Sequence, residues 1–211
     1  MEVLQLLISG ISQGCVYGLI ALGFVLIYKA TEMVNFAQGD LMMLGAFFAY
    51  SYVNIFELPF YLAFPATILT MAIFGALTER LLLRPMIGEP HFSVLMLTIG
   101  LGFILRAVAG AIWGNEPRAL STPYAGGVID LNGLIIGDEN LVIILGTAAL
   151  CLLLYFFFRF TRLGLAMQAA SQNQLAAFYV GIPVKRVYSM VWAISASISA
   201  VAGILVAPVS L

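Results

Sequence analysis

Charged residues are scarce in this 211-residue chain: Asp, Glu, Lys and Arg make up 9% of it, against about 25% in soluble globular proteins. There is one histidine, His91, and there are two cysteines, Cys15 and Cys151, both inside apolar stretches. This composition argues against a disulfide framework and offers no cluster of metal ligands. We therefore expect no metal and no cofactor, and interpret both cysteines as small buried hydrophobic residues.

Several chemical motifs are also missing from the sequence. There is no Gly-x-x-x-x-Gly-Lys-[Ser/Thr] loop, so the chain does not bind ATP in that mode. No grouping of Ser, His and Asp suggests nucleophilic catalysis, and no basic patch with aromatic residues suggests nucleic acid. The sequence thus predicts a protein that is not an enzyme and does not bind nucleic acid.

What the chain does have is long apolar runs, because 63% of its residues are hydrophobic. A run of about 20 apolar residues can cross a bilayer as a helix, whereas a membrane barrel needs short alternating segments. Pro59, Pro90 and Pro117 mark span boundaries, since proline cannot extend a helix. We predict an all-α, polytopic transmembrane bundle that forms one domain over 1–211. Its six spans are 3–28, 34–55, 60–83, 92–113, 141–158 and 188–210.

Orientation follows from the positions of Lys and Arg, which favour the cytoplasmic side of a membrane. If segment 159–187 is cytoplasmic, alternation of the spans places seven basic residues inside and only Arg118 outside. The amino end is then external, as is the loop 114–140 with its acidic residues. Alternating apolar residues around 127–136 suggest a small hairpin or a re-entrant piece, and the loop is either a docking site for a soluble donor protein or an ordinary connector. The seven residues are Lys29, Arg80, Arg84, Arg159, Arg162, Lys185 and Arg186.

Five polar residues within the spans are candidates for lining a translocation path: Gln13, Asn35, Gln38, Asp40 and Arg106. The polar start of the second span is interpreted first as an interfacial cap, and alternatively as a half-length helix at the centre of a path. Asp40 is compatible with both interpretations, because a helix dipole favours an acidic residue near the helix start. Arg106 either snorkels to the external surface or binds a substrate carboxylate, because an unpaired charge is costly in a membrane. Gln13 either lines a path or bonds across helices.

Small residues recur at every fourth position in two of the spans. Gly10, Gly14 and Gly18 form such a ridge in the first span, and Ser195, Ser199, Gly203 and Ala207 form one in the last. Ridges of this kind let another helix backbone approach closely. They predict a compact bundle and carry no chemistry.

The segment 159–187 interrupts two apolar runs with basic and alanine-rich sequence. We predict one short helix over 163–171, and a second that starts after Asn173 as N-cap and ends at Gly181, with Pro183 beyond it. The second helix presents apolar side chains, which either fill a groove in a soluble partner or lie flat on the membrane surface.

The segment 175–181 resembles the Glu-Ala-Ala-x-x-x-Gly loop of ABC-importer permeases, with Leu175 in place of the acid. The chain as a whole is similar to the inner-membrane permeases for branched-chain amino acids, specifically their H-type subunit. Besides segment 164–182, four stretches carry this likeness: 18–28, Asn35-Phe-Ala-Gln-Gly-Asp40 with its surroundings, Glu79-Arg80 with Arg84-Pro85, and 98–101.

This resemblance implies a permease subunit that pairs with a second permease, sits on two ATP-binding cassette subunits, which hydrolyse ATP, and receives substrate from an external binding protein. The residues implied to couple it to the ATPases are Leu175, Ala176, Ala177, Phe178, Tyr179 and Gly181. Family members continue with further spans, so we expect this chain to be truncated at its carboxyl end. Alternatives are a related permease for urea, short amides or sugars, a self-sufficient channel or secondary transporter, and a membrane scaffold.

Overall fold

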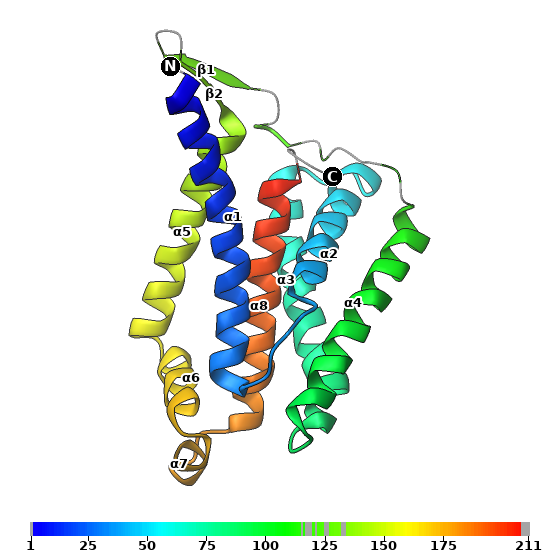
Figure 1. Cartoon of the computed structure of the whole chain (residues 1–211), viewed down its shortest axis with the longest axis vertical. Coiled ribbons are helices and arrows are strands. Elements are labelled where there is room, and N and C mark those ends of the chain that lie inside the picture. Colours follow the sequence, from blue (N-terminus) through cyan, green and yellow to red (C-terminus); the bar gives the residue numbers. More distant parts are fainter. Residues whose placement is uncertain are drawn as a thin grey trace.

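The structure, a computed structural model, describes residues 2–114, 116, 120, 122–124, 127–131 and 134–207. Arg118 and Pro117, both used in the sequence predictions, lie outside these residues. Figure 1 shows a bundle of long helices running roughly side by side. Among the described residues, five helices are long and apolar enough to cross a membrane: α1 (Glu2–Thr31), α3 (Phe60–Thr78), α4 (His91–Trp113), α5 (Asp138–Phe160) and α8 (Val184–Val206). The all-α membrane fold is therefore confirmed.

The second predicted span is shorter than the sequence suggested. Its helix, α2 (Gln38–Tyr50), begins four residues later than predicted and continues as a π-helical turn, Ser51–Ile55. Figure 1 shows the connector after α1 turning back along the bundle, so that α2 begins partway along it. The start of α2 is therefore inside the bundle rather than at one end of it, and its place at the centre of a translocation path stays a prediction. It lies inside because Asn35 and Gln38 find partners there, described below.

The two ends of the bundle carry different structures. At one end the antiparallel strands β1 (Val128–Leu131) and β2 (Leu134–Gly137) form the small hairpin that the alternating sequence suggested. At the other end lie the short helices α6 (Arg162–Gln172) and α7 (Gln174–Tyr179) (Figure 1). We call these the hairpin end and the α7 end. The seven basic residues assigned to one side of the membrane all flank helix termini at the α7 end.

The last long helix, α8, occupies the centre of the bundle and packs against α1, α2 and α3. Its small-residue ridge is used as predicted: Ser195 and Ser199 are buried, and a side chain at Gly203 would collide with the backbone of α2. On the facing helix α2, a Cβ atom at Gly45 would lie 2.6 Å from Ala200 Cα. Close backbone contact therefore fixes α8 against its neighbours.

The ridge on α1 behaves differently. Gly10, Gly14 and Gly18 are exposed, and within the described part of the chain no atom outside the local backbone lies within 4 Å of a Cβ placed on any of them. The ridge is therefore available to a helix of another chain.

The π-helical turn Glu79–Leu83 and a 3₁₀ turn, Arg84–Met86, extend α3 toward the α7 end. Pro59 and Pro90 are the N-cap residues of α3 and α4, which agrees with the boundaries that the prolines predict.

Candidate functional site: a coupling segment and a polar cluster

Helix α7 has the caps that the sequence predicts. The side chain of Asn173 accepts a hydrogen bond from the Ala176 backbone N–H at 2.9 Å, which stabilises the first turn. At the other end Gly181 adopts a φ of +86°, a conformation that glycine tolerates best, and the Ile182 N–H donates to the Ala177 carbonyl at 2.9 Å. These caps hold a six-residue helix that is too short to be stable alone.

The outer face of α7 is apolar and exposed. Leu175, Phe178 and Tyr179 are 70%, 65% and 82% exposed, whereas Ala177 is buried against the rest of the chain. Ala176 is exposed beside them, and Gly181 ends the segment. The predicted coupling residues are therefore brought together on one projecting helix, with the small Ala177 as its contact to the bundle.

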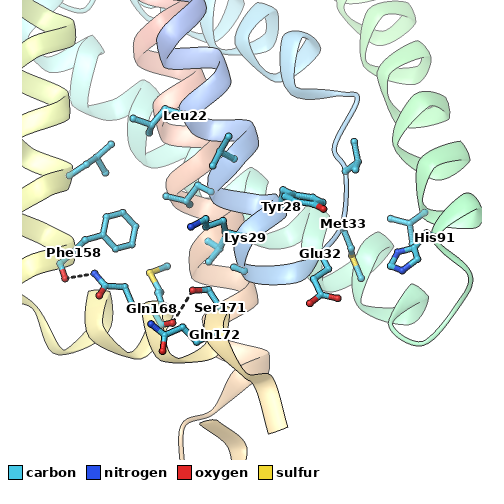
Figure 2. A pocket seen from close by; sticks show the side chains of 18 of the residues that line it. Leu22, Tyr28, Lys29, Glu32, Met33, His91, Phe158, Gln168, Ser171 and Gln172 are labelled. Carbon is cyan, nitrogen blue, oxygen red and sulfur yellow. Dashed lines mark hydrogen bonds between the residues drawn. The ribbon is translucent and has the colours of Figure 1, made fainter. Parts of the chain in front are cut away.

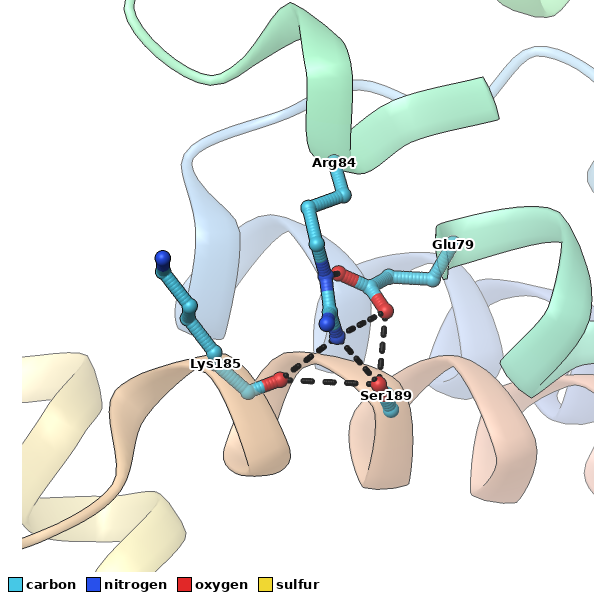
Figure 3. A network of polar contacts seen from close by, with 4 residues as sticks. All are labelled: Glu79, Arg84, Lys185 and Ser189. Atoms are coloured by element: carbon cyan, nitrogen blue, oxygen red, sulfur yellow. Dashed lines mark hydrogen bonds and ion pairs between the residues drawn. The ribbon is translucent and has the colours of Figure 1, made fainter. Parts of the chain in front are cut away.

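A polar clamp joins the start of α8 to the end of α3 (Figure 3). The Arg84 Nε and Nη2 groups donate to the two carboxylate oxygens of Glu79 at 3.1 and 2.8 Å. The Ser189 hydroxyl donates to Glu79 at 2.6 Å, and Arg84 also donates to the Lys185 carbonyl at 3.0 Å. Because Glu79 is only 2% exposed, these bonds offset the cost of burying its charge. Glu79 and Arg84 were noted from the sequence only as part of a resemblance, and no sequence signal indicated their contact with α8.

Asn35 and Gln38 are buried in the middle of the bundle and bonded to it. The Gln38 amide donates to the Ser199 hydroxyl at 2.7 Å, and the Asn35 amide donates to the Gln38 carbonyl oxygen at 3.1 Å. Ser195 donates to the Gly23 carbonyl of α1 at 2.9 Å. This network explains how the irregular backbone before α2 exists among membrane helices, where unpaired polar groups are costly.

Asp40 and Arg106 form an ion pair between α2 and α4. Arg106 Nε lies 2.6 Å from Asp40 Oδ1, and the side chains are 65% and 7% exposed respectively. Helix α4 is also tied to the π-helical turn after α2 by the Trp113 indole, which donates to Ser51 at 2.7 Å. Thr98 ties α4 to the connector before α2, because it accepts from the Phe36 N–H at 3.3 Å. Arg106 therefore pairs with Asp40 within a helix apolar enough to span a membrane, while its snorkelling to the external surface and its binding of a substrate carboxylate both stay predictions.

Gln13 is not part of this polar cluster. It is exposed on α1, on the same face as Gly10 and Gly14. The role of all five predicted path residues in translocation stays a prediction, but the structure brings only four of them near one another.

A large cavity of about 1030 Å³ opens at the α7 end. Figure 2 shows side chains from the end of α1 (Tyr28, Lys29), the connector after it (Glu32, Met33) and the first turn of α4 (His91) facing this space. Helix α6 supplies another wall, where Gln168 donates to the Phe158 carbonyl at 2.9 Å. No sequence signal predicted the cavity, since its walls come from separate segments.

Comparisons with known proteins identify the family. The sequence profile described as "Branched-chain amino acid transport system / permease component" matches residues 6–210. The chain is 27% identical to BraD, the high-affinity branched-chain amino acid transport system permease protein of Pseudomonas aeruginosa, and to its counterpart LivH of Escherichia coli K12, over 96% of this chain and 70% of each relative. It is 30% identical to the probable branched-chain amino acid transport permease protein LivH of Methanocaldococcus jannaschii, over 88% of this chain and 60% of the relative.

No solved structure matches the chain. The profile nevertheless covers nearly the whole sequence, and the relatives agree with one another in their descriptions. The apolar helices and the resemblance found in the sequence fit the same assignment. The chain therefore belongs to the branched-chain amino acid transport permease family, a family of transport components rather than enzymes, and is a multi-pass protein of the inner membrane.

Proposed function

We propose that this chain is the membrane-spanning permease subunit of an ATP-driven importer for branched-chain amino acids. The relatives' names give the substrate class and the transport role. The observation that carries the coupling assignment is α7: a short, capped helix that holds Leu175, Phe178 and Tyr179 exposed beyond the ends of the long helices. Apolar side chains held this way fit a groove in a soluble partner.

The proposed orientation places the α7 end in the cytoplasm and the amino end outside. Seven basic residues flank the helix termini at the α7 end, and basic residues near short loops favour the cytoplasmic side. This puts α7 where ATP-binding cassette subunits work, and puts the loop 114–140 where an external substrate-binding protein docks.

In this proposal two connections carry movement from α7 into the bundle. Only Val180 to Pro183 separate α7 from α8, and the clamp of Glu79, Arg84 and Ser189 then joins α8 to α3. In the other direction along the chain, α6 forms a wall of the large cavity. A shift of the coupling segment therefore changes the relation of α8 to its neighbours and the width of the cavity, which is a hinge-like response to ATP.

The same proposal includes a second permease subunit. Support comes from α1, whose open ridge of Gly10, Gly14 and Gly18 lies beside the exposed amide of Gln13. Small residues with a polar group are typical of helix contacts in membranes. In such an assembly ATP binds to the two ATP-binding cassette subunits and not to this chain.

The experiment is co-purification of the ATP-binding cassette subunit with the full complex. We expect Phe178→Asp to reduce the recovered ATPase at least tenfold, because a charge replaces an apolar contact of the kind worth about 2 kcal/mol or more. Gly181→Pro should act similarly, because proline cannot adopt the φ of +86° at this position.

Ile87→Asp is the matched control, since Ile87 is also exposed at the α7 end but lies between α3 and α4, away from α7. It should leave the ATPase bound. If Phe178→Asp and Gly181→Pro both retain the ATPase at the level of the control, the coupling assignment is wrong.

A further inference from the structure

A small cleft lies where α4 packs on the start of α2, separate from the large cavity. Its volume is about 190 Å³, and it is lined by Phe36, Asp40, Ile99, Gly102, Phe103 and Arg106. Helix α4 packs chiefly against α2 in the described part of the chain, so the far side of the cleft is open. The cleft therefore faces either lipid, water or another chain.

The exposed guanidinium of Arg106 argues against a cleft filled by lipid. Asp40 holds the guanidinium by its Nε group at 2.6 Å, and the side chain remains 65% exposed. Within the described residues neither Nη group has a hydrogen-bond partner, which leaves several N–H donors directed out of the pair. Arg106 belongs to a helix apolar enough to span a membrane, where free guanidinium donors are costly in hydrocarbon, so they favour water or an anion over lipid tails.

The other walls of the cleft are apolar. Phe36 and Phe103 are 57% and 65% exposed, and Ile99, which also lines the cleft, is half-buried. The Phe103 ring lies 6.0 Å from Arg106 Cζ, so the charge and the apolar wall adjoin. A site with one cationic end and a short apolar wall matches a small carboxylate that has a hydrocarbon side chain.

We propose that this cleft binds an amino acid in transit, with the substrate carboxylate on the free Nη groups of Arg106 and the branched side chain against Phe36, Ile99 and Phe103. Asp40 is a positioning residue: it fixes the guanidinium by Nε and leaves the Nη edge open. This inference rests on the proposed importer function and gives it a substrate contact. A planar guanidinium suits a carboxylate because it can donate two parallel hydrogen bonds.

The first test separates binding from folding. The assembled importer, with its ATPase subunits and binding protein, is placed in liposomes and the uptake of labelled L-leucine is measured.

Arg106→Gln alone leaves Asp40 buried and unpaired, so we compare it with Asp40→Asn/Arg106→Gln, in which neither charge remains. We expect the double variant to assemble in normal amounts but to import leucine at least tenfold more slowly, since charge-assisted bonds are lost. Arg106→Lys should recover part of the uptake.

If the double variant imports leucine within about twofold of the unmodified importer, the pair is purely structural and the proposal is overturned.

The second test does not depend on transport. Ile99→Cys is introduced into a Cys15→Ser/Cys151→Ser background, and its reaction with a water-soluble, membrane-impermeant thiol reagent is followed. We expect millimolar L-leucine to slow the reaction, 3-methylbutylamine, which lacks the carboxylate, to leave it unchanged, and Arg106→Gln to abolish the protection.

The outcomes of this test are distinct. Protection without leucine import would overturn the importer assignment and support the cleft. Import without protection would overturn the cleft alone. A thiol that never reacts would show a cleft closed by lipid or by a second permease, and would also overturn the proposal.

Discussion

Asp40 is covered by a helix that has no side chain at the point of contact. A Cβ atom at Gly102 of α4 would overlap the Asp40 carboxylate, so only glycine lets α4 lie close enough for Arg106 to pair with Asp40. Gly100, two residues earlier on the same helix, has no neighbouring atom within 4 Å of such a Cβ. The two glycines thus have opposite expected responses to the same change.

Gly102→Ala should destabilise the chain by about 1–3 kcal/mol, because the added methyl group displaces a buried, charge-paired side chain. Gly100→Ala should be neutral or stabilising by about 0.5–1 kcal/mol, because alanine has less backbone entropy to lose in a helix. Thermal unfolding of the purified chain in detergent compares the two variants. Equal melting temperatures would show that α4 does not pack on Asp40 as described.

Helix boundaries that depend on local chemistry were predicted correctly from the sequence. Asn173 and Gly181 cap α7, and Pro59 and Pro90 begin their helices, because each depends only on its own backbone and near neighbours. The pairing of Asp40 with Arg106 was not predictable, because 66 residues separate them and a lone charge in a span has several outcomes.

Among the helices, apolar length predicted α1, α3, α4, α5 and α8 but misplaced the start of α2. Hydropathy registers how apolar a segment is, whereas Gln38 is buried because Ser195 and Ser199 of α8 satisfy its amide. The clamp between α3 and α8 was missed for the same reason, since its partners are about 100 residues apart in sequence. The contacts that set the geometry of the candidate site are long-range.

Arg84→Ala should weaken the link between α3 and α8. It removes two charge-assisted hydrogen bonds from Glu79, which is 2% exposed, and we expect a loss of about 1.5–3 kcal/mol of stability. Arg80→Ala is the control: Arg80 is exposed, has no ion pair among the described residues, and should change stability by less than about 0.5 kcal/mol. Chemical or thermal unfolding in detergent measures both. A loss in Arg84→Ala no larger than in the control would rule out a stabilising clamp.

The bundle as an assembly unit is organised around α8, while α1 and α4 each keep an exposed, mainly apolar face on which a few small or polar residues stand. Sequence patterns predicted both small-residue ridges, but not which of them packs against other helices of the same chain. Ser195, Ser199 and Gly203 are covered within this chain, and Gly10, Gly14 and Gly18 are not. The difference depends on which helix the fold places at the centre, which no single span encodes.

Gly14→Leu should therefore leave the bundle intact and break its pairing with a second permease. Nothing in the described part of the chain meets a side chain at Gly14, so the melting temperature of the isolated subunit should not fall. Close approach of another helix would be blocked, and co-purification of the second permease should drop severalfold. Gly45→Leu is the contrasting variant, since it collides with Ala200 and should destabilise the subunit itself. Pairing that survives Gly14→Leu would place the permease contact elsewhere.

The bond between Gln38 and Ser199 has a consequence for biosynthesis. Its two partners are separated by 161 residues, so the ribosome delivers the amides of Asn35 and Gln38 to the membrane long before their hydroxyl partners exist. Until α8 arrives, this stretch must stay hydrated or be shielded by the insertion machinery, because bare amides are unstable among lipid tails. Insertion of the early helices is then provisional, and the arrival of α8 completes it.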